Sequence, residues 1–266
     1  MSHHESSLKA QFYLTAPQPC AYLDGREERK VFTTLNGGMA GSVNNTLSQK
    51  GFRRSQSVIY RPACVGCSAC MSIRIPVAGF QPSRGQRRVL KRNATLRRRP
   101  CEAWATETQF ALFRRYLSAR HADGGMADMD AFDYASMVDE TPVNSVVVEY
   151  IEEDPVTGER QLIAACLTDV LGDGLSMVYS FFEPGEEARS LGSYMILDHI
   201  DMAREMRLDH VYLGYWVSGS RKMDYKIAYK PFELCDGTSW HRFESRAQID
   251  TWQARRFQRI QDRILG

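Results

Sequence analysis

The sequence predicts an α/β (α+β) fold built on a mixed sheet, and two observations support this prediction. Three strand-like segments follow one another at residues 143–153, 161–171 and 175–184, separated by the short turn sequences "DPVTGER" and "GDG". An amphipathic segment at 189–207 comes next, and a further strand-like run, "HVYLGYWV", follows it at 210–217. The expected order is therefore an antiparallel meander, a helix and one more strand.

The first hundred residues predict a different kind of domain, rich in loops and poor in apolar core. Short strand-like runs such as "QFYLT" and "RKVFTT" are separated by clusters of Pro, Gly and Asn. After Pro100 the apolar residues recur at helical spacing over residues 102–121, and the Gly-rich "ADGGMADMD" ends that helix. We therefore expect two domains, at 1–100 and 101–266, with a last helix at 244–265 that packs over the sheet or lies along a partner.

Composition excludes several classes of protein. With 43% hydrophobic and 25% charged residues, the chain of 266 residues has the make-up of a folded globular protein. No apolar run approaches the roughly 20 residues that span a bilayer, and the polar start "MSHHESSLKAQ" lacks the apolar core of a secretory signal. We expect a cytoplasmic protein without a membrane partner, whose seven cysteines are thiols or metal ligands and not disulfides.

Positive charge is concentrated in one segment. Between Arg84 and Arg99 the run "RGQRRVLKRNATLRRR" carries eight Lys or Arg and no acid, although the net charge of the chain is only +2. Subtracting those eight leaves +2 − 8 = −6 for the remainder. Such a run favours a partner that carries phosphates, because basic side chains release the counterions of a polyanion. The alternative is a solvated basic helix face.

The cysteines also cluster. "YRPACVGCSAC" places Cys64, Cys67 and Cys70 three residues apart, and the distant Cys20 brings the number of possible ligands to four. Four thiolates suit a tetrahedral zinc ion or an iron–sulfur cluster. The alternative is a set of uncoordinated thiols that brace a loop-rich domain.

Familiar nucleotide and nucleophile motifs are missing from the sequence. There is no G-x-x-x-x-G-K-[ST] loop, no G-x-G-x-x-G after a strand and no G-x-S-x-G. A reaction catalysed by this chain would therefore draw on a substrate that is already activated.

Four stretches together resemble one family, the aminoacyl-tRNA–protein transferases, in its bacterial aspartate/glutamate leucyltransferase branch. They are "PCAYLDGR" (19–26), "GFRRSQSVIYRPACVGCSACMSIRIPV" (51–77), "FFEPGEEARSLGSYMILDHI" (181–200) and "YLGYWVSGSRKMDYKIAYKPFEL" (212–234). The resemblance implies a Cys-containing N-terminal domain joined to a GNAT-like acyltransferase domain. Leu23 stands where the eukaryotic arginyl-transferring relatives have a second cysteine, which favours the bacterial branch.

The resemblance also implies an activity and its partners. Leucine would pass from leucyl-tRNA to the α-amino group of proteins with N-terminal Asp or Glu, which marks them for degradation. Such aminolysis of an ester requires no cofactor for transfer, because a peptide amine with a pKa near 8 is partly neutral at pH 7. The alternatives are arginyl transfer, a non-catalytic tRNA-binding or metal-sensing module, and a coenzyme A-dependent acetyltransferase.

Candidate site residues follow from this chemistry. Arg53 and Arg54 suit bidentate capture of the acidic side chain. Asp224 and Tyr225 are the candidates for proton transfer and for donation to the oxyanion. Lysines at a spacing of four would form one stripe of a helix and bind tRNA, together with the basic segment and the start of the helix after 188. These predicted tRNA contacts are Arg87, Arg88, Lys91, Arg92, Arg189, Gly192, Lys222, Lys226 and Lys230.

Overall fold

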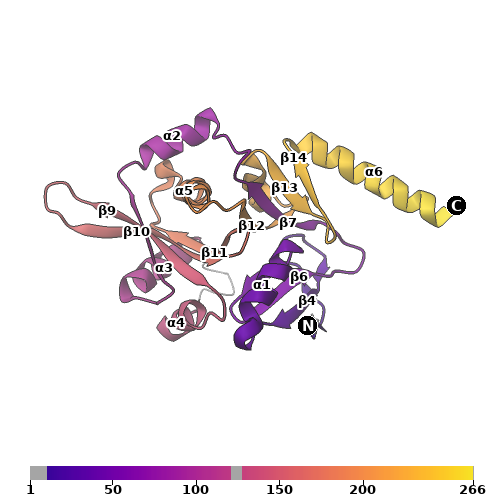
Figure 1. Cartoon of the computed structure of the whole chain (residues 1–266), viewed down its shortest axis with the longest axis horizontal. Helices are drawn as coiled ribbons and strands as arrows, with labels where there is room; N and C mark the ends of the chain where they lie inside the picture. Colours follow the sequence, from indigo (N-terminus) through magenta and orange to yellow (C-terminus); the bar gives the residue numbers. More distant parts are fainter. Residues whose placement is uncertain (1–10, 121–127, 266) are drawn as a thin grey trace, which may run out of the picture.

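An eight-stranded mixed sheet forms the centre of the computed structural model, which describes residues 11–120 and 128–265, with residues 257–265 as backbone alone (Figure 1). Its strands are, in spatial order, β14 (Trp240–Phe243), β13 (Phe232–Cys235), β7 (Cys70–Pro76), β12 (His210–Val217), β11 (Gly174–Phe182), β10 (Arg160–Val170), β9 (Ser145–Glu153) and β8 (Arg97–Glu102). Neighbours are antiparallel except β11 and β12, which are parallel.

The predicted order of elements is confirmed in this sheet. Strands β9, β10 and β11 form the antiparallel meander, and α5 (Leu191–Glu205) carries the chain from β11 to the parallel β12. A helical crossover is the usual connection between parallel neighbours, because a short turn cannot reverse the chain twice. The α/β fold with a mixed sheet is therefore present as expected.

The sheet also takes strands from the first hundred residues. Strand β7 lies between β12 and β13, and β8 begins before residue 100 and forms the edge beside β9. The domain boundary at residue 100 stays a prediction. Whatever the boundary, the segment that carries the clustered cysteines leads directly into a buried strand of the large sheet.

A smaller sheet is built from the start of the chain. It has the order β1 (Tyr13–Leu14), β4 (Lys30–Thr34), β6 (Val58–Pro62) and β5 (Arg53–Ser55), and the ribbon of β2 (Gln18–Pro19) and β3 (Glu27–Glu28) stands beside it. Its core is small, formed with η1 (Gly37–Met39) and α1 (Ala40–Gln49), and consists of Leu35, Ala40, Leu47, Phe52 and Ile59. The apolar core of this part is therefore thin, as the loop-rich sequence predicts.

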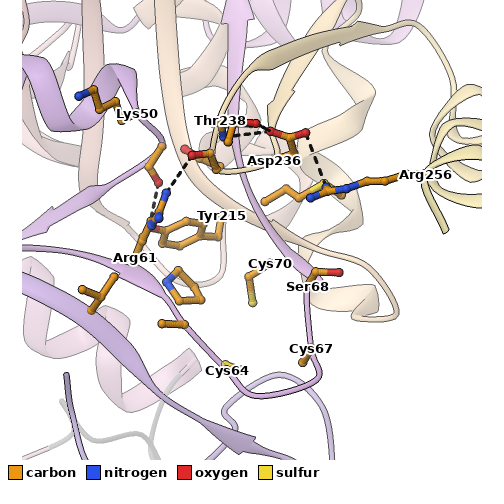
Figure 2. Close-up of a pocket in the computed structure, with 18 residues that line it drawn as sticks. Lys50, Arg61, Cys64, Cys67, Ser68, Cys70, Tyr215, Asp236, Thr238 and Arg256 are labelled. Atoms are coloured by element: carbon orange, nitrogen blue, oxygen red, sulfur yellow. Dashed lines mark hydrogen bonds and ion pairs between the residues drawn. The ribbon is translucent and has the colours of Figure 1, made fainter. Parts of the chain in front are cut away.

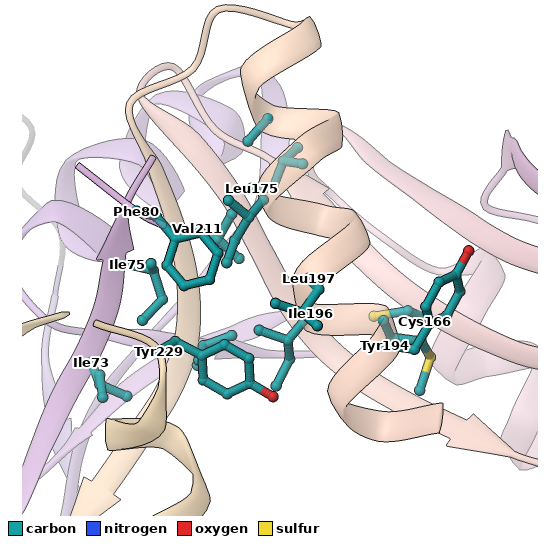
Figure 3. Packing of buried hydrophobic residues seen from close by; sticks show 14 of the residues in the cluster. Ile73, Ile75, Phe80, Cys166, Leu175, Tyr194, Ile196, Leu197, Val211 and Tyr229 are labelled. Atoms are coloured by element: carbon teal, nitrogen blue, oxygen red, sulfur yellow. The ribbon is translucent and has the colours of Figure 1, made fainter. Parts of the chain in front are cut away.

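Helices cover both faces of the large sheet. On one face α5 packs Ile196 and Leu197 against Leu175 and Val211 of β11 and β12 (Figure 3). On the other face lie α3 (Glu107–Arg120) and α4 (Ala131–Asp139), whose buried side chains form a second cluster. The Gly-rich stretch expected to end α3 falls largely outside the described residues. The sheet therefore separates two apolar layers.

Two basic helices complete the structure. Helix α2 (Arg84–Arg92) begins with a capping box, in which Ser83 Oγ accepts from the Gln86 amide and the Gln86 side chain accepts from the Ser83 amide. Helix α6 (Arg246–Leu265) starts beside β14 and then extends away from the body (Figure 1). Its first turns pack Ile249 and Trp252 against the core. No described helix is long and apolar enough to cross a membrane.

Candidate active site

A cleft opens where β11 and β12 diverge. Their parallel pairing covers only Gly174 with His210, Leu175 with Val211 and Ser176 with Tyr212, although both strands continue beyond these pairs. Beyond that point the strands separate and leave a cavity of about 860 Å³. Strand ends that separate in this way free backbone carbonyls that would otherwise pair across the sheet.

Arg53 donates a hydrogen bond to one of these carbonyls. The register between β10 and β11 jumps from Leu167 opposite Tyr179 to Thr168 opposite Met177, so that Val178 forms a bulge. The Val178 carbonyl accepts a hydrogen bond from Arg53 Nη2 at 2.6 Å. Gly214 has a φ of +74°, and a Cβ there would lie 2.3 Å from Arg53 Nη1. Glycine at 214 is therefore the residue that lets this arginine lie across β12.

Lys226 donates a hydrogen bond to a carbonyl of the other strand, β12. It belongs to η3 (Arg221–Ala228), is buried, and donates from Nζ to the Tyr215 carbonyl at 2.7 Å. Burial, with a smaller contribution from the positive charge of Arg53, lowers the pKa of Lys226 to about 7. The two strands at the opening are therefore each contacted by a basic side chain. The guanidinium of Arg53 stays charged, whereas the amine of Lys226 has a pKa of about 7.

The predicted lysine stripe does not form. Residues 221–228 make a 3₁₀ helix, in which three residues complete a turn, so side chains four apart point in different directions. Lys222 and Lys230 are exposed, whereas Lys226 between them is buried. The geometry does not favour the predicted contact of Lys226 with tRNA phosphate, because the side chain is buried and its amine donates to a carbonyl, although the residue lines the cleft.

Arg54 has a structural role and not the predicted role in substrate binding. Its guanidinium donates from Nε and Nη2 to the two carboxylate oxygens of Asp169, each at 2.6 Å, and from Nη1 to the Gln56 carbonyl. Both charged side chains are only 1% exposed. Adjacent residues of a strand face opposite sides, so Arg53 reaches the cleft while Arg54 reaches β10.

The start of α5 differs from the predicted phosphate site. Arg189 donates from its two Nη atoms to the carboxylate of Glu152, each at 3.0 Å, and from Nε to Asn93, so its charge is already paired. Gly192 lines the cleft, where an added Cβ would be 3.4 Å from the Phe182 ring, an ordinary contact. The geometry gives no support to a tRNA contact at Gly192. It disfavours the contact predicted for Arg189, because the charge of that residue is paired with Glu152.

The two proposed catalytic residues are separated by their contacts. Asp224 accepts from Arg246 Nη1 at 2.6 Å and from Trp216 Nε1, and it is not among the residues that line the cleft. Tyr225 does line the cleft and is 52% exposed, and partial desolvation raises the pKa of its phenol, so the phenol is protonated and able to donate. Of the two candidates, only Tyr225 lines the cleft, and its catalytic role stays a prediction.

The basic segment divides into a free half and a paired half. Arg97, Arg98 and Arg99 contact carboxylates on β9 and α5, which corrects the expectation that the whole run is uncompensated. The cations of α2 are exposed and, among the described residues, form no ion pair; they are Arg84, Arg87, Arg88, Lys91 and Arg92.

Helix α2 bridges two segments that line the cleft. At its start Gln86 Nε2 donates to the Ala228 carbonyl at the end of η3, at 3.2 Å. At its end Arg92 donates to the Ala188 carbonyl, and Asn93 donates to the Arg189 carbonyl at 2.9 Å. The free cations therefore lie on a helix that is bonded to the end of η3 and to the turn before α5.

The thiols gather around a small cavity of about 80 Å³ that Cys20, Cys64, Cys67 and Cys70 all line. A larger cavity of about 330 Å³ is lined by Cys64, Cys67 and Cys70 together with Tyr215 and Arg61 (Figure 2). Burial and the neighbouring thiols raise the pKa of Cys70 to about 12. Within the described residues, no group of three or more His, Cys, Asp or Glu side chains is arranged to hold a metal ion.

Tyr22 links this thiol region to the cleft, because its side chain lines both cavities. Sequence reasoning missed Tyr22, the cleft residue Arg120 and Gly214. Only Gly214 had a signal in the sequence, since a glycine inside the strand run "HVYLGYWV" indicates a close backbone approach. Tyr22 and Arg120 lie on segments whose approach to the cleft only the fold determines.

A mixed sheet that opens between two parallel strands is the arrangement expected of a GNAT-like acyltransferase fold. Comparisons with known proteins narrow this fold class. The family models described as arginine-tRNA-protein transferase, N terminus and C terminus, match residues 18–88 and 108–236. The chain is 60% identical to the aspartate/glutamate leucyltransferase of Cereibacter sphaeroides strain ATCC 17029 over 89% of this chain and 85% of that one.

Another relative and a solved structure complete the comparison. The aspartate/glutamate leucyltransferase of Paracoccus denitrificans is 58% identical over 90% of this chain and 87% of that one. Among solved structures, FemX has a TM-score of 0.46 at 9% identity, covering 79% of this chain and 69% of that one. The chain therefore belongs to the arginine-tRNA-protein transferase family, in the branch of the aspartate/glutamate leucyltransferases. It is an aminoacyltransferase.

Proposed function

We propose that the chain transfers leucine from leucyl-tRNA to the α-amino group of proteins that begin with Asp or Glu. The names of its relatives support both substrates. The observation that carries the proposal is the cleft between β11 and β12, which Arg53 lines, together with the exposed cations of α2, a helix bonded to two segments that contribute to the cleft. An acidic acceptor and a polyanionic donor need cations in these two places.

Arg53 is the group proposed to bind the acidic side chain of the acceptor. A guanidinium has five N–H donors, and among the described residues Arg53 uses one of them, toward Val178. The remaining donors suit a carboxylate at bidentate geometry. Arg54 cannot share this role, because Asp169 already occupies its fork.

The exposed cations of α2 are proposed to bind the tRNA backbone. Phosphate contacts position a nucleic acid without reading its sequence. Since α2 is bonded to the ends of the segments that line the cleft, tRNA lying along this helix could direct its aminoacylated 3′ end into the opening.

The chemistry asks for one proton acceptor and one oxyanion donor. The neutral α-amine attacks the ester carbonyl, an amide bond forms, the ester C–O bond breaks, and the 3′ hydroxyl of tRNA leaves after taking a proton. Lys226, with a pKa of about 7, is proposed to accept the proton that the attacking amine loses. Tyr225, whose phenol stays protonated, is proposed to donate to the oxyanion.

This mechanism routes no step through a metal. The zinc or iron–sulfur centre at Cys20, Cys64, Cys67 and Cys70 stays a prediction. It is checked by the metal content of anaerobically purified protein beside that of a variant with serine at 64, 67 and 70.

The cytoplasm, where aminoacyl-tRNA is made, is the proposed location.

A transfer assay tests the proposed function. Labelled leucyl-tRNA is incubated with the protein and with peptides that begin with Asp, Glu or Ala, and we expect label in the first two only. Arginyl-tRNA in a parallel reaction tests the arginyl alternative. Binding of tRNA without any transfer would instead support a non-catalytic module, and dependence on acetyl-coenzyme A would support an acetyltransferase.

A further inference from the structure

The cleft has a different chemical character on each face of the sheet. Met177, Ile196, Leu213 and Met223 line it and belong to the apolar cluster beneath α5. Tyr116 and Tyr179 line it on the other face and pack with the cluster beneath α3. Arg120, which also lines the cleft, ends α3 on that second face. We call Met177, Ile196, Leu213 and Met223 the apolar wall.

None of the four residues of the apolar wall carries a charge. Two acids line the cleft elsewhere, Glu186 and Glu187, in the turn before α5. Their side chains are 42% and 65% exposed, and they contact Arg189 at 4.0 Å and Arg120 at 3.4 Å. A cation placed against the apolar wall would lose its water, and the two acids of the cleft already contact arginines, so such a placement is unfavourable.

The basic helix lies on the same face as the apolar wall. Helix α2 packs against α5, with its half-buried Val89 and Leu90 against the same apolar cluster. A nucleic acid bound along α2 therefore approaches the cleft from the face that carries the apolar wall. The acceptor is left with the opposite side, where Arg53 enters from β5.

We propose that the apolar wall holds the side chain of the donor amino acid and restricts transfer to uncharged aliphatic donors. This inference rests on the proposed function and adds the residues that select the donor. Met223 on η3 and Met177 on β11 are half-buried and flexible, so they can close around a branched or a straight aliphatic chain.

Misacylated tRNA tests the inference on the unmodified protein. One tRNA body, that of leucine, is charged with leucine, methionine or lysine, so that only the donor side chain changes. We expect leucine and methionine to be transferred to a peptide that begins with Asp, and lysine to be transferred at least about tenfold more slowly. Equal transfer of all three amino acids would overturn the inference.

Variants locate the selection. Met223→Glu in η3 and Met177→Glu in β11 should each lower the preference for leucine over lysine by about tenfold or more. Met223→Leu should keep the preference. Met206→Glu is the matched control, because Met206 is exposed at the end of α5 and away from the cleft. Circular dichroism and melting temperature establish that each variant is folded.

The outcomes separate the inference from the proposed function. If the unmodified protein transfers leucine to the Asp peptide and both glutamate variants keep its donor preference, the inference is wrong and the proposed function stands. If the unmodified protein transfers no leucine from leucyl-tRNA, both are overturned. A lost preference in the two variants, with the preference kept in Met206→Glu, supports the apolar wall as the donor subsite.

Discussion

Arg53 and Lys226 show how a single hydrogen bond to the backbone can position a charge inside a cleft. Each donates to a carbonyl that the divergence of β11 and β12 has freed, Val178 in one strand and Tyr215 in the other. Backbone polar groups that lack a strand partner need another partner. The two cations therefore satisfy backbone carbonyls at the opening of the cleft.

Substitution of Arg53 should abolish the preference for acidic acceptors. Arg53→Gln is expected to lower kcat/KM for a peptide that begins with Asp by about tenfold to a hundredfold, since a charge-assisted hydrogen bond is lost. Transfer to a peptide that begins with Ala should change little. Arg61→Gln is the control, because Arg61 lines the second cavity and not the cleft. An unchanged ratio of Asp to Ala transfer in Arg53→Gln would remove Arg53 from the acceptor site.

Lys226 should make stability depend on pH. Its pKa is about 7 in the folded protein and near the ordinary 10.5 when unfolded, so the unfolded chain binds more protons between these values. Stability therefore rises as pH increases from about 7 toward 10.5, and the cost of the buried charge is fully present below pH 7.

Thermal melts of Lys226→Met against the parent protein measure this dependence. The rise of melting temperature between pH 7 and pH 9 should be smaller in Lys226→Met. Lys222→Met, which removes an exposed lysine of the same 3₁₀ helix, should keep the rise. If melting temperature depends on pH in the same way in the parent and in Lys226→Met, the amine of Lys226 has the same pKa in the folded and unfolded states.

At the scale of elements, α2 combines a half-buried apolar side and a charged side in nine residues. Val89 and Leu90 pack against the core, whereas the five cations of the helix face solvent. Its bonds to Ala228 and Ala188 hold the helix to the two segments beside the cleft. The helix therefore works as a fixed basic surface and not as a mobile tail.

Removing charge from α2 should weaken tRNA binding without weakening the fold. The triple variant Arg84→Gln, Arg88→Gln and Lys91→Gln is expected to bind tRNA less tightly. The slope of log affinity against log salt should fall by roughly 0.7 to 0.9 for each phosphate that the variant no longer neutralises. Binding measured between about 50 and 200 mM salt provides the test.

A second triple variant controls for net charge. Arg97→Gln, Arg114→Gln and Arg160→Gln removes three exposed cations from outside α2 and should leave the salt slope near that of the parent protein. If the slope falls equally in both triple variants, tRNA is attracted by overall charge and not by the helix.

At the scale of the whole molecule, one buried ion pair joins the two sheets. Arg54 of β5 in the small sheet contacts Asp169 of β10 in the large sheet, and Ser145 Oγ donates to the same carboxylate at 2.6 Å. Because Arg53 is the next residue in β5, this pair also sets how far Arg53 reaches into the cleft. The small sheet, with its thin core, depends on such contacts for its position.

Breaking this pair should cost more stability than removing it entirely. Asp169→Asn leaves Arg54 buried without its counter-charge, and we expect the free energy of unfolding to fall by about 3–5 kcal/mol in urea titrations. The double variant Arg54→Met, Asp169→Leu should recover part of that loss. Glu153→Gln, in an exposed pair with Arg160, should cost under about 1 kcal/mol. Equal losses in the single and double variants would argue against an uncompensated charge as the cause.

Much of the large sheet could be predicted from local pattern. Alternating and helical spacing indicated β9, β10, β11, α5 and β12, because each element buries one face and its sequence records which residues lie there. The positions of β7 and β8 were not predictable in this way. They pair with strands that lie far away in the chain, and pairing of that kind leaves no local period.

The candidate site was only partly predictable. Residue type indicated a carboxylate-binding site at Arg53 and Arg54, which stays a prediction, and a basic surface at 84–92, since carboxylates and phosphates require cations. It could not distinguish Arg53 from Arg54, or Lys226 from Lys222, because burial separates the members of each pair.

The sequence by itself determined the central strands and helices, the segment in which cations cluster, and the motifs of the family. Only the tertiary structure decided which of those cations are free. Arg54 is neutralised by a carboxylate 115 residues away, and Arg189 by one 37 residues away. Whether a charge is available to a substrate depends on what lies within a few ångströms of it, and chain folding alone brings such distant partners together.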